Sequence, residues 1–386
     1  MQYRNDKQGR PLSMLGLGCM RFPNSKAETE SLLLAAIEGG VNFFDTAYMY
    51  PNSEKTLGAI LAKHKKRKDI YIGTKLPLLM CKGSQDFDRF FDEQLRRLQT
   101  DYIDYYFLHN VPDYATWEKF RNWGIEAWAA EKKKAGQIAN LGFSYHGTCG
   151  DFLKVIDEYS WDFCMIQYNY YDVHYQAGEA GLKAAAEKNI PVFVMEPLLG
   201  GRLATGVPKQ AVELFHKANP TLTPADWALR WLWNQSEVTL VLSGMSSTQQ
   251  VEQNIRAASE FKPLSAAELA VYDKVVGVFR KSYKIPCTGC NYCLPCPKGI
   301  NIPACLAAYN SSYTQNYYTG ISLYFNSTAA LTKQPVSPRQ CNSCGKCERQ
   351  CPQNIAIAKT LKKTAGRLEP LPLQLGLAVA RKFLTR

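Results

Sequence analysis

The sequence predicts an α/β fold class, a closed (β/α)8 barrel, followed by a small cysteine-rich domain. From residue 12 onward, eight short runs rich in β-branched and aromatic residues alternate with stretches of helical periodicity, the pattern of repeated βα units. Eight strands with their helices make up this barrel. A doubly wound sheet is the alternative, but it normally carries G-x-G-x-x-G after its first strand, where this chain reads GLGCMR.

Each expected strand is bounded by turn residues or by a helical pattern. The eight strands are SMLGLGCM, VNFFDTA, IYIGTKL, YIDYYFLH, IANLGFSY, FCMIQYN, PVFVMEPL and VTLVLSGM. The barrel pattern ends near residue 262, and Ala266–Lys281 is expected to form a helix. The predicted divisions are therefore a barrel at 1–262, a linking helix at 263–282 and a cysteine-rich domain with its tail at 283–386.

Two segments of the second domain have no clear periodicity. The Tyr-, Asn- and Ser-rich insertion at 309–328 is expected to pack irregularly, with a partner surface as the alternative. The apolar and basic tail at 371–386 is expected to form a packed final helix, with contact to a membrane surface as the alternative.

Composition indicates a soluble, cytoplasmic globular protein. Hydrophobic residues make up 46% of the 386 residues and charged residues 21%, which is ample for a core. The N-terminus lacks an apolar signal region, and no run of about 18 apolar residues predicts an integral membrane segment. The net charge of +12 could suit an acidic protein, a phosphorylated ligand or nucleic acid, or it could reflect an unspecialised basic surface. No nucleic-acid-binding motif accompanies it, so nucleic acid is not an expected partner.

Polar residues stand at the carboxyl ends of the predicted strands, where barrel enzymes carry their chemistry. Asp45 ends the second strand, Tyr50 lies on the loop behind it, Lys75 ends the third strand and His109 ends the fourth. Singly, each could be a cap, a solvated side chain or a core histidine. Jointly, an Asp45–Lys75 ion pair would place a cation near the Tyr50 hydroxyl and lower its pKa from about 10, making the phenol a usable general acid.

The motifs D-T-A-x-x-Y, G-T-K and strand-end L-H resemble the Asp, Tyr, Lys and His tetrad of the aldo/keto reductase family. The resemblance covers roughly residues 10–260. It implies a barrel enzyme whose coenzyme, NAD(P)(H), lies extended across the mouth without a Rossmann motif. Tyr50 would give a proton to a small carbonyl substrate as hydride arrives, or take one from the alcohol, and His109 would orient the carbonyl oxygen.

The resemblance also assigns coenzyme contacts. Tyr145 stands where the family usually has an asparagine that binds the carboxamide, and Met195 replaces a stacking tyrosine. Gln250 replaces an arginine that often binds the 2′-phosphate, which favours NAD, although Arg256 keeps NADP open. Residues 198–202 resemble the pyrophosphate loop. The expected coenzyme-binding residues are Gly18, Cys19, Met20, Ser144, Gln167, Met195, Pro197, Leu198, Gly200, Arg202, Ser243, Gly244, Met245, Gln250, Gln253 and Asn254.

Eight of the thirteen cysteines fall in two runs that form an internal repeat. Each run ends in Cys-Pro, and the continuations CPKGI and CPQNI place an isoleucine at the same distance. Without an export signal, disulfides are not expected, and we interpret the runs as metal ligands. The runs consist of Cys287, Cys290, Cys293 and Cys296, and of Cys341, Cys344, Cys347 and Cys351.

The two runs resemble a bacterial-type ferredoxin with two [4Fe–4S] clusters, in which each last cysteine ligates the other cluster. The resemblance implies that Cys351 joins the first three cysteines of the first run, and that Cys296 joins those of the second. The first run has one residue fewer before its last cysteine, so local ligation of each cluster stays open. Zinc also uses C-x2-C spacing but normally pairs two such units.

The combination predicts an oxidoreductase whose clusters link the barrel to an acidic external electron carrier, such as a ferredoxin, flavodoxin or other flavoprotein. Hydride carries two electrons together, and the sequence has no flavin motif that would separate them. A partner's flavin, radical chemistry of the substrate, or clusters isolated from the barrel are all open. The alternatives are a conventional carbonyl reductase with structural or redox-sensing clusters, and a non-catalytic nucleotide-binding electron-carrier or regulatory subunit.

Overall fold

The computed structural model describes residues 1–328, 335–370 and 374. The chain forms two compact units: unit 1 comprises Met1–Leu198 and Ala225–Ser265, and unit 2 comprises Leu199–Pro224 and Ala266–Arg386. The predicted division placed 199–224 in the barrel. This segment instead groups with unit 2 because α8 (Lys209–Ala218) packs against α11 (Ala266–Ser282), where the rings of Phe215 and Tyr272 meet edge-on. The expected final helix at 371–386 lies outside the described residues, apart from residue 374.

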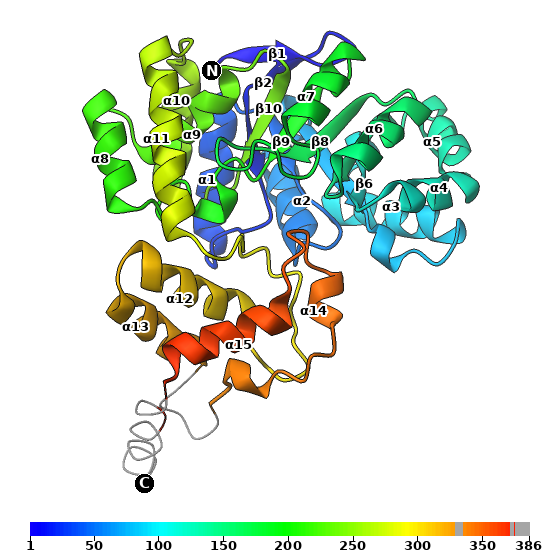
Figure 1. Cartoon of the computed structure of the whole chain (residues 1–386). Helices are drawn as coiled ribbons and strands as arrows, with labels where there is room; N and C mark the ends of the chain where they lie inside the picture. Colours follow the sequence, from blue (N-terminus) through cyan, green and yellow to red (C-terminus); the bar gives the residue numbers. More distant parts are fainter. Residues whose placement is uncertain (329–334, 371–373, 375–386) are drawn as a thin grey trace. The chain divides into compact units, whose positions relative to one another are not determined.

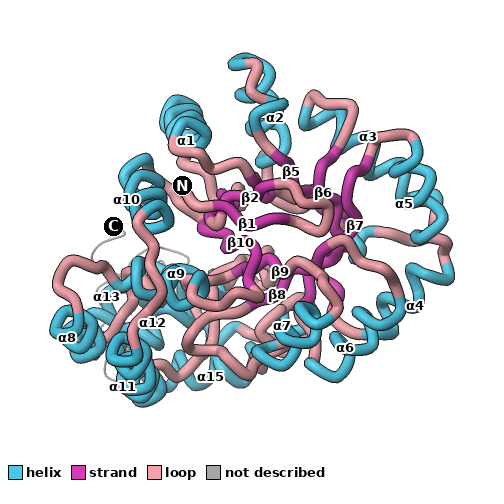
Figure 2. Tube along the Cα trace, turned by 90° about the horizontal axis from the view of Figure 1, so that it is seen from above, coloured by secondary structure: helices cyan, strands magenta, loops and turns pink. Residues whose placement is uncertain are grey.

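Unit 1 is a closed barrel of eight parallel strands (Figure 2). The strands neighbour one another in chain order, and β10 closes the barrel against β3. All eight predicted strands are present, and the doubly wound alternative is wrong. The strands are β3 (Leu15–Gly18), β4 (Phe43–Asp45), β5 (Tyr71–Leu76), β6 (Ile103–Val111), β7 (Ile138–Tyr145), β8 (Phe163–Gln167), β9 (Val192–Met195) and β10 (Val238–Ser243).

A hairpin that the sequence did not predict precedes the barrel. Strands β1 (Tyr3–Asn5) and β2 (Pro11–Ser13) pair antiparallel. In the turn between them, Asp6 accepts hydrogen bonds from Arg10 and, at 2.6 Å, from the hydroxyl of Tyr105 on β6. The barrel interior is filled mainly by aromatic rings, including Phe43, Phe163 and Phe193. The strands are therefore held on a packed core, which leaves their carboxyl ends to carry polar side chains.

Helices surround the barrel (Figures 1 and 2). Their termini follow ordinary capping, as where Ser25, Thr148 and Ser247 accept backbone N–H groups of the first turn. The helices are α1 (Lys26–Glu38), α2 (Ser53–His64), α3 (Gln85–Leu98), α4 (Tyr114–Asn122), α5 (Ile125–Lys134), α6 (Cys149–Glu158), α7 (Gly178–Glu187), α9 (Pro224–Trp233) and α10 (Thr248–Ser259).

Unit 2 is helical around a small apolar core. The predicted helix at 266–281 is present as α11, whereas the irregular packing expected for 309–328 is wrong. This segment completes α12 (Ile302–Thr314) and forms α13 (Tyr317–Thr328), which pack as a pair. Tyr324 is buried with Leu306 in the same core, so this aromatic residue of the insertion serves packing, whereas Tyr318 is exposed. Two further helices are α14 (Lys346–Arg349) and α15 (Ile357–Leu368).

Candidate active site and cysteine-lined sites

A buried ion pair lies at the carboxyl ends of β4 and β5. Lys75 Nζ donates to Asp45 Oδ1 at 2.5 Å and to the backbone oxygen of Thr46 at 2.7 Å. Lys75 is 1% exposed and Asp45 5%. Burial lowers the pKa of the Lys75 ammonium, and the carboxylate of Asp45 opposes this shift. The pairing therefore keeps a cation inside the mouth of the barrel.

Tyr50 and His109 lie beside this ion pair, so the four predicted tetrad residues come together. Lys75 Nζ is 5.1 Å from the centroid of the Tyr50 ring. The rings of Tyr50 and His109 meet edge-on with centroids 5.9 Å apart. Burial, then the charge of Lys75, holds the pKa of His109 well below its usual value. His109 is therefore a neutral imidazole, which can donate a hydrogen bond to a substrate oxygen without adding charge.

His146 is a polar residue of this region that the sequence did not single out. Its ring acts on His109 strongly enough to contribute to the lowered pKa of that residue. Burial lowers the pKa of His146 itself to about 4, and a hydrogen bond with Gln176 opposes the shift. The available signal was its place directly after β7, where the chain reads FSYH. A polar side chain at a strand end of this barrel belongs among the candidates.

Ser144 and Gln167 end β7 and β8 as predicted, and both are buried. Ser144 Oγ accepts the backbone N–H of Asn110 at 2.8 Å, and Gln167 Oε1 accepts Gln176 Nε2 at 3.0 Å. Tyr145 does not join them. Its hydroxyl donates to the carbonyl of Thr148 and its ring packs in the core between barrel and helices. Tyr145 therefore supplies no substitute for the family's asparagine.

The remaining predicted coenzyme residues of unit 1 lie at three strand ends. Beyond β3, Cys19 follows Gly18 and is buried against β4, where its N–H donates to the backbone carbonyl oxygen of Asp45. Beyond β10, Asn254 Nδ2 donates to Ser243 Oγ at 2.9 Å, and Gln250 Oε1 accepts the N–H of Ser246 at 2.8 Å. The other members are Met20 in the loop after β3, Met195, which ends β9, Pro197 and Leu198 in the loop after β9, Gly244 and Met245 in the loop before α10, and Gln253 within α10.

Gly200 and Arg202 belong to unit 2 and contact the extended loop that leads into the first cysteine run. Arg202 Nη1 lies 3.4 Å from the carbonyl oxygen of Ile285 and 3.3 Å from that of Cys287. The same guanidinium stacks 4.0 Å above the Tyr283 ring. Gly200 has φ +67°, and a Cβ there would lie 1.9 Å from the oxygen of Thr288. The segment predicted to bind pyrophosphate therefore also packs against this loop.

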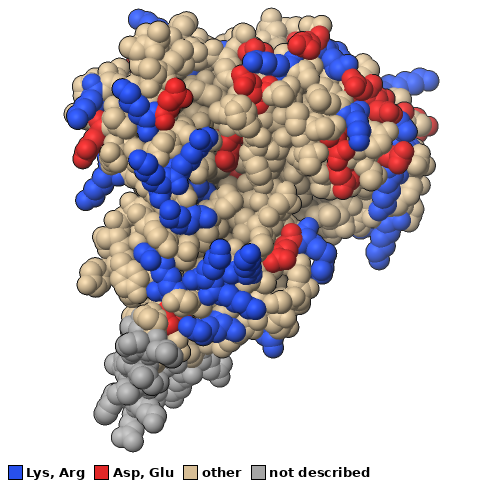
Figure 3. Space-filling model, in the orientation of Figure 1, with Lys and Arg blue, Asp and Glu red and all other residues tan. Residues whose placement is uncertain are grey.

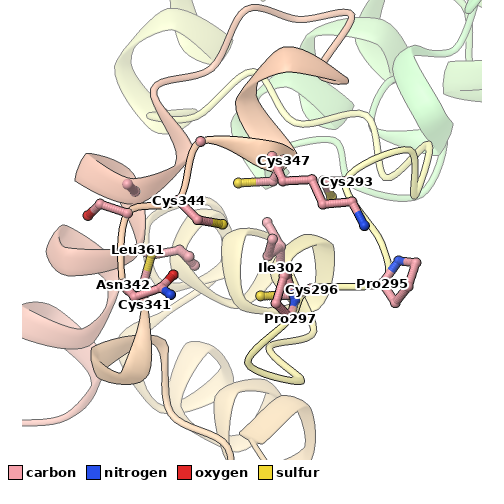
Figure 4. A pocket seen from close by; sticks show the side chains of 14 residues that line it. Cys293, Pro295, Cys296, Pro297, Ile302, Cys341, Asn342, Cys344, Cys347 and Leu361 are labelled. Atoms are coloured by element: carbon pink, nitrogen blue, oxygen red, sulfur yellow. The ribbon is translucent and has the colours of Figure 1, made fainter. Parts of the chain in front are cut away.

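The cysteines line two separate pockets, and each pocket combines both runs. One pocket is lined by Cys287, Cys290, Cys293 and Cys351. The other is lined by Cys341, Cys344, Cys347 and Cys296, with Cys293 at its edge. Figure 4 shows the sulfur atoms of these four residues turned toward one space while that of Cys293 lies apart. This grouping is the exchanged arrangement that the ferredoxin resemblance implies.

The internal repeat extends to the backbone. Gly289 and Ser343, each just before the second cysteine of a run, have φ values of +67° and +57°, and the residues after that cysteine, Asn291 and Gly345, also have positive φ. The last cysteine of each run begins a turn. The N–H of Gly299 donates to the carbonyl oxygen of Cys296 at 2.8 Å, and the N–H of Asn354 donates to that of Cys351 at 3.1 Å. Left-handed backbone is uncommon outside glycine and asparagine, so its recurrence at matching positions shows that the two cysteine runs share one loop conformation.

Each pocket offers four cysteine side chains, which is the donor set that a [4Fe–4S] cluster uses. Within the described ranges, no three His, Cys, Asp or Glu side chains are grouped closely enough to hold one metal ion. Burial is the main cause that raises the pKa of Cys293 to about 12, and the nearby charges of Cys290, Cys287 and Cys351 raise it further. Four thiolates in one apolar pocket therefore need a cationic group to balance them.

No helix in the described part of the chain has the length and apolarity needed to cross a membrane.

Comparison with known proteins covers both units. Residues 14–276 match the model of the aldo/keto reductase family, and residues 286–356 match that of a 4Fe-4S dicluster domain. The chain is 29% identical over 285 residues to the uncharacterized oxidoreductase YqkF of Bacillus subtilis, covering 64% of this chain and 88% of YqkF.

A second relative is an aldo-keto reductase of Mycolicibacterium vanbaalenii, 30% identical over 273 residues, with 70% of this chain and 89% of the relative covered. The holo form of aldo-keto reductase AKR11C1 from Bacillus halodurans matches with a TM-score of 0.60 and 26% identity, over 71% of this chain and 96% of that one. This chain belongs to the aldo/keto reductase family of oxidoreductases and carries a 4Fe-4S dicluster domain C-terminal to the barrel in the sequence.

Proposed function

We propose that the protein is an NAD(P)(H)-dependent oxidoreductase that interconverts a small carbonyl compound and its alcohol. The observation that carries the proposal is the cluster of Asp45, Tyr50, Lys75 and His109 at the carboxyl ends of three neighbouring strands. Family membership supports it independently. A purely nucleotide-binding role would not need a buried cation beside a tyrosine.

The four tetrad residues have different roles in proton transfer. The nicotinamide, when bound, supplies or accepts the hydride at the substrate carbon. Tyr50 gives its hydroxyl proton to the carbonyl oxygen or takes the proton of the alcohol. The Lys75 cation, held by Asp45, favours the phenolate form of Tyr50 and so eases proton loss. Neutral His109 donates a hydrogen bond to the substrate oxygen and orients it.

The coenzyme preference rests on the start of α10. Gln250 is uncharged, and its side-chain oxygen accepts the N–H of Ser246. It would therefore not neutralise a 2′-phosphate. Arg256, two turns further along α10, is the cation of this helix that could do so. We therefore keep both NADH and NADPH as coenzymes, to be separated by assay.

We further propose that the two four-cysteine pockets hold two [4Fe–4S] clusters that exchange electrons with an external carrier. The clusters supply one-electron transfer, which hydride chemistry lacks. Two clusters could each hold one of the two electrons of a hydride, and the group that separates this pair would be a flavin of a partner protein. The supporting observation is the pairing of the cysteines, with Cys351 beside the first run and Cys296 beside the second.

The test is an anaerobic assay of the full chain with iron and acid-labile sulfide measured beforehand. A panel of small aldehydes and ketones is offered with NADH or NADPH, and the alcohol product is identified. We expect reduction of at least one carbonyl, and its loss in Tyr50→Phe. Protein that is loaded with clusters, binds coenzyme and reduces no carbonyl would contradict the proposal.

A further inference from the structure

The segment that carries the cysteines is strongly basic. Between residues 283 and 370 the sequence has ten Lys and Arg residues but two acidic residues, Glu348 and Glu369. Both acidic side chains have partners within the unit. Glu348 accepts the N–H of Ala358 at 2.8 Å, and Glu369 pairs with Arg339 at 3.0 Å. The positive charge of this segment is therefore not balanced by its own carboxylates.

Three lysines form a stripe on α15. Lys359, Lys362 and Lys363 are exposed, and their i, i+3 and i+4 spacing places them on one face of the helix. The opposite face is buried through residues such as Leu361 and Leu368. Among the described residues none of the three lysines has an ion-pair partner. Like charges at these spacings destabilise a helix, so the stability of α15 does not explain the stripe.

The stripe borders the second cysteine pocket. Ala358 and Leu361 of α15 line this pocket together with Lys346 of α14. Cys344, which lines it too, is the exposed member of the eight run cysteines. Figure 3 shows Lys and Arg side chains gathered on the face of unit 2 where α14 and α15 lie in Figure 1. The basic surface and the open edge of the pocket are thus parts of one face.

We propose that this face docks an acidic one-electron carrier protein and that the pocket of Cys341, Cys344, Cys347 and Cys296 is where electrons leave or enter the chain. The proposal rests on the proposed clusters. In the step, one electron passes from the reduced group in this pocket to the oxidised carrier, and no bond or proton is transferred. A cationic face steers an anionic partner and raises its association rate. Because Cys344 lines this pocket and is exposed, the distance that an electron must cross between the pocket and a docked carrier is short.

The test uses the full chain with both clusters, reduced by dithionite, and oxidised acidic flavodoxin as the probe in stopped flow. The variant is Lys359→Glu, Lys362→Glu and Lys363→Glu combined. We expect its second-order rate at low salt to fall by about tenfold or more, and the gap to narrow at high salt. A basic cytochrome c, as the alternative acceptor, should react as fast or faster with the variant.

The matched control reverses the same number of charges on unit 1, at the exposed residues Lys55, Lys68 and Lys82. Equal flavodoxin rates in wild type and the α15 variant at low salt, or equal slowing in both variants, would overturn the proposal. The proposal would also be overturned if the α15 variant lost binding to anionic lipid vesicles or duplex DNA while it reduced flavodoxin as fast as wild type. Because dithionite supplies the electrons, a failure of NAD(P)H to reduce the clusters would count against the proposed relay and not against this surface.

Discussion

The guanidinium of Arg202 lies 3.3 Å from the backbone carbonyl oxygen of Cys287, the first cysteine of the first run. A second carbonyl, that of Ile285, and the ring of Tyr283 hold the same guanidinium. Planar Arg can satisfy two carbonyls and stack at once, which a lysine ammonium cannot. Arg202 thus stabilises the loop that presents Cys287, whatever it contributes to coenzyme binding.

Replacing Arg202 by alanine should shorten the lifetime of the clusters. We expect cluster absorbance in the presence of an iron chelator to decay several-fold faster in Arg202→Ala than in wild type, with Arg202→Lys intermediate. Arg121→Ala, which removes an ion pair on unit 1, is the control and should decay as wild type does. Unchanged decay together with a large rise in the KM for coenzyme would show that Arg202 serves phosphate binding instead.

Tyr50→Phe should remove general acid catalysis. We expect kcat for carbonyl reduction to fall by about 10²–10⁴, with cluster content and coenzyme binding retained. Tyr48→Phe is a matched control two residues away, because the Tyr48 ring packs on Phe90 and under Arg97. Its activity should stay close to wild type. Equal losses in the two variants would place the proton donor elsewhere.

Paired substitutions distinguish exchanged from local ligation of the clusters. If ligation is exchanged, Cys296→Ser with Cys341→Ser damages one cluster and leaves about four iron atoms per chain, whereas Cys341→Ser with Cys351→Ser damages both. Local ligation predicts the reverse, since Cys341 and Cys351 would then share a cluster. Iron and sulfide analysis of the two double variants, purified anaerobically, decides between the arrangements.

His146 should make the barrel less stable in mild acid. Its pKa is about 4 in the folded chain and about 6.5 when unfolded, so between these values the unfolded chain binds more protons. The free energy of unfolding therefore falls as pH drops from about 6.5 toward about 4. We expect His146→Gln to lose less stability than wild type between pH 7 and pH 5, measured by thermal unfolding. An equal loss in the two proteins would mean that His146 is not buried as a neutral ring.

Much of the barrel could be predicted because its signals are local. Each strand is a short apolar run, and each tetrad residue follows a strand end, so the closed topology alone brings Asp45, Lys75 and His109 together. The internal repeat likewise defines the cysteine loops. His146 was missed because a single polar residue after β7 does not reveal which side chains will face it.

Other features depend on long-range packing. The N-terminal hairpin consists of very short strands, and its role depends on Asp6 reaching Tyr105 in the barrel. The insertion at 309–328 reads as polar and aromatic, yet it forms helices because Tyr324 is buried in the core around Leu306. The grouping of 199–224 with unit 2 follows from the contact between α8 and α11. No local sequence pattern predicts this contact.

The central claim is that one chain couples nicotinamide chemistry to iron–sulfur clusters. The most direct measurement adds NADH or NADPH to the anaerobic protein, with and without an added flavin or flavoprotein, and follows cluster absorbance with spin resonance to count reduced centres. The account predicts that the clusters bleach, and that reduced centres appear, when coenzyme and flavin are both present. Clusters that dithionite reduces but coenzyme leaves oxidised under every condition, in protein that still reduces a carbonyl, would contradict it.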